Sequence, residues 1–207
     1  DGSGEWSIDT ESAVPDSGTF APNVNGTNEV TVTSTDAAGN STVDTTNLEL
    51  TIDTTDPAEP TVLSQITNDT TPVIEGTAEI GSTVTVVVAG VTYTTTADGS
   101  GNWSIDTEIE KPDDGVFAPN MNGTNEIVVT SMDTAGNSTV DTTSLELTID
   151  ATPPAEPTIV SQITNDTTPV LSGKAEIGST DTVVVAGATY TATADGSGEW
   201  SIDTEIA

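Results

Sequence analysis

The chain has 207 residues, with 34 acidic side chains against two basic ones, no histidine and no cysteine, for a formal net charge of -32. Nucleic acid and anionic lipid are bound through Lys and Arg, so this composition excludes both as partners. Without His or Cys there is no Ser–His or Cys–His pair and no His- or Cys-bound zinc, so we do not expect an enzyme.

A six-residue motif recurs along the chain at a fixed interval. It spans Asp1 to Trp6, and returns as Asp98–Trp103 and as Asp195–Trp200. The step is 97 residues both times, from position 1 to 98 and from 98 to 195. Repetition at a fixed period is typical of tandem modules, so we expect two full periods with both ends of the chain inside a module.

Proline marks the expected boundaries between modules. The two Pro-dense stretches are 53–60 and 150–157. Proline fixes φ and removes a ladder donor, which predicts short, stiff linkers here. We therefore expect the back half of a module, strands E–G, at 1–55, a complete module at 56–152, and the front half of the next, strands A–E, at 153–207.

The complete module is predicted to be all β. Runs rich in Val, Ile and Thr, separated by turn residues, predict seven strands at 61–66, 72–78, 83–89, 91–97, 103–107, 125–132 and 139–149. Seven short strands in a module of roughly 95 residues are typical of an immunoglobulin-like β-sandwich. The residues expected to face inward are Val84, Val86, Val88, Tyr93, Trp103, Ile105, Phe117, Leu145, Leu147 and Ile149.

Acidic residues converge on one end of this predicted module. If successive strands alternate in direction, the loops 79–82, 98–102 and 133–137 meet at the end that the linker 53–59 reaches. Calcium takes roughly six to eight oxygen ligands, which carboxylates and amides supply. We expect calcium ions at each junction, with the ligands Asp53, Asp98 and Asp133 assisted by Glu79 or Asn137, and with Asp150, Asp195 and Glu176 at the next junction.

A simpler interpretation of the same residues is that they form plain turns. Asp98-Gly and Asp133-Thr-Ala-Gly-Asn137 are good turn sequences, in which Asp and Asn accept hydrogen bonds from their own backbone. Convergence at one end of the module, together with the charge of -32, favours calcium. A second acidic set at the opposite end, which includes Asp69, Asp106 and Asp114, is interpreted as solvated, with another calcium site as the alternative.

Four motifs resemble a known family. They are T-N-D-T-T-P-V-I-E-G-T-A at 67–78, A-D-G-S-G-N-W-S at 97–104, D-T-A-G-N at 133–137 and L-T-I-D at 147–150. They resemble the bacterial Ig-like tandem repeats of giant, type-I-secreted adhesins of the repeats-in-toxin and biofilm type. The resemblance covers the whole chain. It implies calcium between neighbouring modules of the same chain, an extracellular, cell-surface location, and an adhesion target bound by other parts of the full protein.

The function expected from these observations is mechanical. We expect a structural extender, or stalk segment, rigidified by calcium at the junctions, because near-identical copies suit a spacer whereas recognition sites diversify. The alternatives are an adhesive or glycan-binding Ig-like module, a spacer in a secreted polysaccharide-degrading enzyme, and a self-assembling extracellular filament whose half-modules pair between chains. No apolar run is long enough to span a membrane, so direct membrane insertion is not expected.

Overall fold

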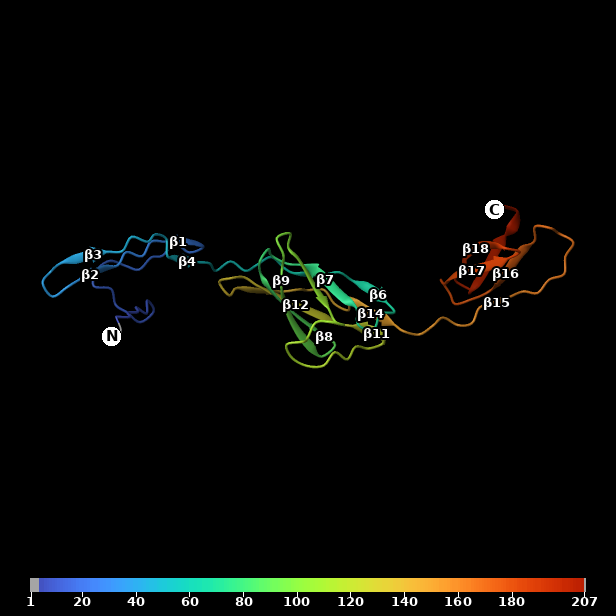
Figure 1. Ribbon diagram of the computed structural model, residues 1–207, viewed down its shortest axis with the longest axis horizontal. Helices are drawn as coiled ribbons and strands as arrows, with labels where there is room; N and C mark the ends of the chain where they lie inside the picture. The colour runs from blue at the N-terminus through green and yellow to red at the C-terminus, as the bar shows by residue number, and fades with distance from the viewer. Residues whose placement is uncertain (1–3, 207) are drawn as a thin grey trace. The chain divides into compact units, whose positions relative to one another are not determined.

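The computed structural model describes residues 4–206 and confirms the all-β class. One short 3-10 helix, Thr204–Ile206, accompanies the strands. The chain divides into two compact units, Asp1–Asp150 and Ala151–Ala207 (Figure 1). The finer division into 1–55, 56–152 and 153–207 stays a prediction. The described residues contain no helix that is long and apolar enough to cross a membrane.

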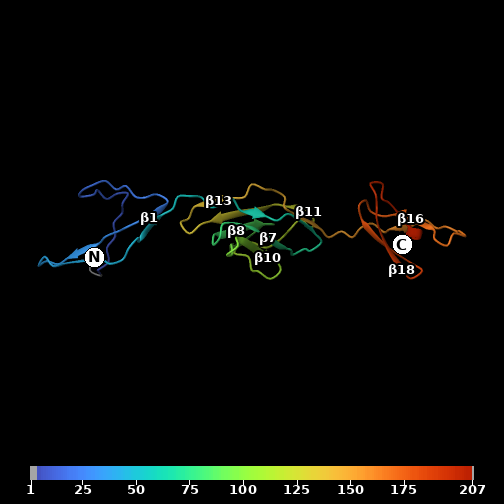
Figure 2. The same cartoon turned by 90° about the horizontal axis from the view of Figure 1, so that it is seen from above.

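Residues 61–150 hold the best-developed part of the fold, built from three sheets. One sheet has the order β10 (Asn102–Asp106), β7 (Val73–Thr77), β5 (Thr61–Val62). A second has the order β11 (Asn122–Asn125), β14 (Leu147–Asp150), β6 (Gln65–Thr67). The third has the order β13 (Ser138–Val140), β12 (Ile127–Met132), β8 (Thr83–Val88), β9 (Val91–Thr96). Strands β13 and β11 lie toward opposite ends of this region (Figure 2).

Three of the predicted strands are interrupted because the chain changes sheet within them. The predicted strand 61–66 becomes β5, antiparallel to β7, and β6, parallel to β14. The predicted strand 125–132 becomes β11 and β12, and 139–149 becomes β13 and β14. In the last two cases the first and second pieces belong to different sheets. Glu126 and the segment 141–146 therefore lie where the chain leaves one ladder for another.

The core forms a single apolar cluster around the valines of β8. The residues predicted to face inward on β8, β9, β10 and β14 are buried in this cluster. Phe117, also predicted to face inward, is partly buried and packs against the cluster. The prediction for Leu145 is wrong. Leu145 has a φ of 63° and is 56% exposed. A left-handed residue breaks the strand alternation, so Glu146, at 3% exposure, turns inward beside Leu147.

The flanking segments repeat parts of this pattern with shorter strands. In the first 55 residues β1 (Gly26–Asn28) pairs with β4 (Leu50–Ile52), and β2 (Thr33–Thr35) pairs with β3 (Ser41–Val43). In the second unit the three-stranded sheet is β15 (Thr158–Ile159), β16 (Val170–Lys174), β19 (Glu199–Asp203). Strands β17 (Thr180–Val185) and β18 (Ala188–Thr193) form a hairpin beside a small core of Leu171, Trp200 and Ile202.

Candidate calcium sites

The loop between β12 and β13 is organised around Asp133. Its Oδ1 accepts the backbone N–H groups of Ala135, Gly136 and Asn137 at 2.8, 2.7 and 2.9 Å, and its Oδ2 accepts Asn137 Nδ2 at 2.8 Å. These hydrogen bonds, that of the Asn137 side chain foremost, lower the pKa of Asp133 below 3.8. Gly136, at a φ of 97°, supplies the left-handed residue that the turn requires. The result is an ionised carboxylate held in one place.

The linker that precedes the module is hydrogen-bonded to this same end. Asn137 Nδ2 donates to the backbone oxygen of Asp53 at 3.1 Å, and Thr139 Oγ1 donates to that of Pro57 at 2.8 Å. Glu79 Oε2 accepts the backbone N–H of Ala58 at 3.3 Å. The Asp53 carboxylate accepts the N–H of Thr55 at 2.9 Å. Three polar side chains of the module therefore hold the linker, at Asp53, Pro57 and Ala58. We call these three contacts the linker clamp.

Asp98 lies in the loop beside Glu79, where it stabilises its own turn. Its Oδ1 accepts the N–H groups of Ser100 and Asn102 at 2.7 and 2.9 Å, and these bonds, with Asn102 first, lower the pKa of Asp98. The two loops are joined by a backbone hydrogen bond of 2.8 Å from Ala78 N to Gly101 O. Among the described residues, the carboxylates predicted here do not form a group of three with oxygens within 4.8 Å of one another. Calcium at this junction stays a prediction.

Two of the residues predicted for the next junction, Glu176 and Asp195, repeat the contacts of Glu79 and Asp98. Glu176 Oε2 accepts the N–H of Ala155 at 3.2 Å, as Glu79 does from Ala58. Asp195 Oδ1 accepts the N–H groups of Ser197 and Glu199 at 2.7 and 3.0 Å, which lowers the pKa of Asp195, the Glu199 bond contributing most. Asp150 ends β14 in the first unit. The Glu79 contact with the linker thus recurs at the second junction.

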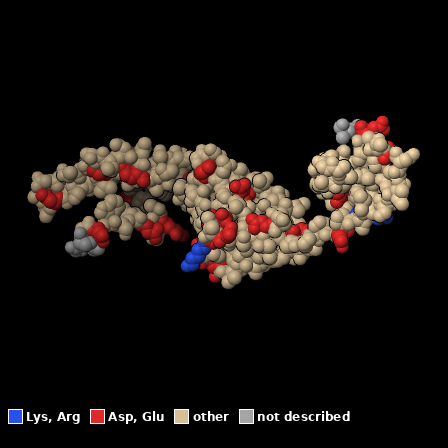
Figure 3. All heavy atoms as spheres, turned by 45° about the vertical axis from the view of Figure 1, so that its right-hand side comes forward, with Lys and Arg blue, Asp and Glu red and all other residues tan. Residues whose placement is uncertain are grey.

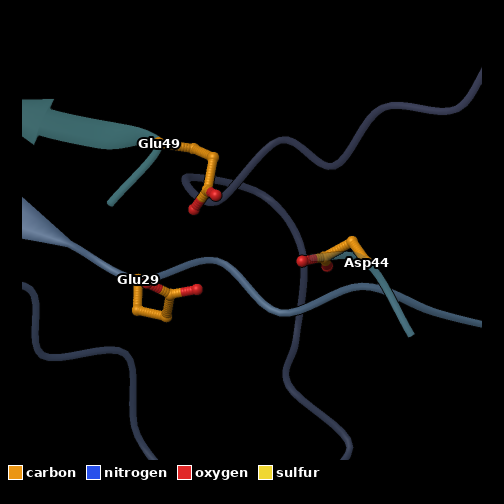
Figure 4. Close-up of side chains that lie close together, drawn as sticks. All are labelled: Glu29, Asp44 and Glu49. Atoms are coloured by element: carbon orange, nitrogen blue, oxygen red, sulfur yellow. The ribbon is translucent and has the colours of Figure 1, made fainter. Parts of the chain in front are cut away.

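One group of carboxylates was missed by the sequence reasoning. Among the described residues, Glu29, Asp44 and Glu49 are the set of three whose oxygens lie within 4.8 Å of one another, and their carboxylates point together from three segments (Figure 4). A hydrogen bond from the Thr46 side chain is the main cause that lowers the pKa of Glu49. The available signal was the run Leu48-Glu49-Leu50, in which an acidic residue separates two leucines of an expected core strand.

Basic side chains offer almost nothing to offset this charge. Acidic side chains recur over the face shown in Figure 3, where Lys is rare. In the part of the chain that the structure describes, the one ion pair is Lys174 Nζ to Glu199 Oε1, at 3.6 Å and largely exposed. Exposed pairs contribute little to stability. Several acidic groups, among them Asp98, Asp133 and Glu146, accept hydrogen bonds from backbone N–H groups instead.

The all-β fold and the acidic loops were compared with known proteins, and a family model matches the central module. Residues 61–151 match the family described as bacterial Ig-like domain, so this segment is a bacterial Ig-like domain of a non-catalytic family, and the resemblance seen in the motifs is confirmed. No curated protein matches the chain.

The chain is also similar to a solved protein described as a Ca2+-stabilized adhesin that helps an Antarctic bacterium reach out and bind ice. The identity is 35% over 84% of this chain and 47% of that one, with a TM-score of 0.36. The chain therefore spans about half the length of that protein.

Proposed function

We propose that the chain is an extender segment of a large bacterial cell-surface adhesin, stiffened by calcium where its modules join. The observation that carries the proposal is the linker clamp. Glu79 accepts the N–H of Ala58 at 3.3 Å, and Glu176 accepts that of Ala155 at 3.2 Å. A contact that repeats with the modules serves the connection between modules, whereas a binding site for an external ligand has no need of a copy in each.

Calcium would supply the positive charge that the carboxylates around the linker lack. Two carboxylates at 4 Å repel by about 4 kcal/mol at an effective dielectric constant near 20, and a bound divalent ion reverses that sign. We propose Asp53, Asp98 and Asp133 as ligands, assisted by Glu79 or Asn137, with Asp150, Asp195 and Glu176 at the following junction. The low pKa of Asp133 keeps this ligand ionised at neutral pH. Binding would join the linker to the loops that it already contacts.

The wider setting belongs to the same proposal. The repeating unit is a seven-stranded sandwich module of 97 residues, matching the interval of its motifs. The similar Antarctic protein is a Ca2+-stabilized adhesin. We assign this chain to the same setting, in which it lies outside the cell, contacts neighbouring modules of its own chain, and leaves the adhesion target to other parts of the full protein.

The proposal is tested by the length of repeat arrays. Arrays of four and eight complete repeats are imaged by electron microscopy in calcium and in EDTA at matched ionic strength. In calcium the end-to-end distance should grow almost in proportion to repeat number, because each joint is fixed. In EDTA it should grow nearer the square root, as for a flexible chain.

Two variants, placed in every repeat, show whether the predicted ligands are responsible. Asp133→Ala should make the array flexible in calcium while each module keeps its β circular dichroism signature. Glu75→Gln removes one exposed charge from the middle of β7 and should change nothing. An array that stays compact in calcium would contradict the extender function. Specific binding of a surface or a glycan by the repeats would support the adhesive alternative.

A further inference from the structure

An unusual strand edge lies along β12 of the central module. Strand β12 pairs with β8 along its whole length, but with β13 only from Thr130 to Met132. Beyond that point carboxylates replace the neighbouring strand. Glu146 Oε2 accepts the N–H of Ile127 at 3.3 Å, and Asp141 Oδ1 accepts the N–H of Val129 at 2.6 Å. N–H groups two residues apart lie on the same edge of a strand, so both carboxylates line one side of β12.

A third carboxylate completes the group in a reciprocal way. Glu126, immediately before β12, accepts the N–H of Leu145 through Oε2 at 2.8 Å. Glu126 therefore holds the residue before Glu146, and Glu146 holds the residue after Glu126. Thr143 Oγ1 donates to Asp141 Oδ2 at 2.9 Å and fixes the Asp141 carboxylate. The sheet changes at Glu126 and at 141–146 are what place these three side chains along the same edge.

The first 55 residues hold the same arrangement in an independent copy. Glu29, Asp44 and Glu49 stand 97 positions before Glu126, Asp141 and Glu146. Their partners correspond, because Leu48 N donates to Glu29 at 2.8 Å, Val30 N to Glu49 at 3.2 Å, and Val32 N to Asp44. In this more exposed copy the carboxylate oxygens lie within 4.8 Å of one another, a spacing that the described oxygens of Glu126, Asp141 and Glu146 do not reach (Figure 4). Two copies with matching contacts indicate a feature encoded by the sequence.

Glu146 provides the observation that points to a ligand. The residue is 3% exposed, and its Oε1 is buried without any hydrogen-bond partner. A buried carboxylate oxygen without a partner is strongly unfavourable, because it has lost water and gained nothing. No basic side chain compensates, since the one ion pair of the described residues is at Lys174 and Glu199. The left-handed Leu145, at a φ of 63°, is the conformation that turns Glu146 inward.

From these observations we propose that the module binds a calcium ion within its own fold, through Glu126, Asp141 and Glu146. Three carboxylates from two segments, Glu126 and 141–146, give a hard oxygen site of irregular geometry. Calcium accepts this geometry, whereas Mg²⁺ requires a near-ideal octahedron. Each oxygen that accepts an N–H keeps a second lone pair for the ion. The site fixes the β13–β14 crossover to β12, so it stabilises the module itself. It does not depend on the junction proposal.

The test follows backbone amides of the full 207-residue chain by NMR during a calcium titration after removal of metal with a chelator. The amides of Ile127, Val129 and Leu145 should shift together, with a Kd on the order of 10⁻⁴ to 10⁻³ M, the range of extracellular calcium modules. Glu146→Gln should weaken this response roughly tenfold or more, since ligand charge tunes calcium affinity. Direct binding by equilibrium dialysis should show one calcium ion fewer per chain.

Matched variants separate this site from the junction and from misfolding. Asp133→Asn, which alters the junction, should leave the response of Ile127 and Val129 intact. Glu75→Gln should also leave it intact, because it removes an exposed charge elsewhere. If Glu146→Gln does not fold, Asp141→Asn takes its place with the same readouts. Amides of Ile127 and Val129 that ignore millimolar calcium, or unchanged stoichiometry in the folded variants, would overturn the proposal.

Discussion

Gly76 offers the sharpest test of how the linker joins the module. It lies in β7 opposite Val62 of β5, the strand that directly follows the linker. A Cβ at this position would stand 1.9 Å from the backbone oxygen of Thr61 and 2.6 Å from Cζ2 of Trp103. The backbone of β5 cannot yield as a flexible side chain would. In Gly76→Ala, β5 must therefore move away by roughly 1.5 Å to regain ordinary contact distance.

The cost of that movement is worked from the contacts that it breaks. Overpacking of a core costs about 1–3 kcal/mol. Displacement of β5 also loosens the 2.8 Å hydrogen bond from Leu63 N to Glu75 O, worth about 1 kcal/mol. We expect Gly76→Ala to lower the free energy of unfolding by about 2–4 kcal/mol, and the melting temperature of the module by roughly 10–30 °C. Differential scanning calorimetry in EDTA measures both.

A matched glycine provides the control. Gly99 has nothing within 4 Å of a Cβ, so Gly99→Ala should stay within about 0.5 kcal/mol of the wild type. Gly173 of the second unit has the same neighbours as Gly76, with Thr158 O at 1.9 Å and Trp200 Cζ2 at 2.6 Å, so its alanine variant should destabilise that unit. If Gly76→Ala melts within about 2 °C of the wild type, the close approach of β5 and β7 is wrong.

Two further measurements address calcium and pH. Calcium at about 100 times its Kd should add about 2.7 kcal/mol to the free energy of unfolding for each site. The melting temperature should then be roughly 10–20 °C higher than in EDTA at matched ionic strength. Coincident melting curves in calcium and EDTA would contradict both calcium proposals. The pKa of Asp133 is lowered in the folded state from 3.8, so its contribution is complete above that pH and is lost as the pH falls through the folded value. The stability advantage of wild type over Asp133→Asn should therefore shrink below about pH 4 in EDTA, and a difference that stays constant from neutral pH to about pH 2 would refute this role.

Local chemistry was sufficient to predict most of the strands and turns. Val84, Val86 and Val88 alternate with Thr85 and Val87, and a period of two places them on one face wherever the strand pairs. Likewise Asp133 forms its turn with partners no more than four residues away. The polar end of the module followed from strand direction alone, and the linker does contact Glu79 and Asn137 there.

Only the tertiary structure decided where strands change sheet, and the carboxylate group depends on those changes. Glu126, Asp141 and Glu146 lie 15 and 5 positions apart, without the spacing of a local metal motif. They lie along one edge of β12 and its crossover because β12 keeps its pairing with β8 while β13 ends at Val140, and because Leu145 takes a left-handed conformation. Alternation along a continuous strand would have pointed Leu145 inward and Glu146 to solvent. Sequence determines the period of a strand, but the point where that period is broken depends on which partner strand continues and which one ends.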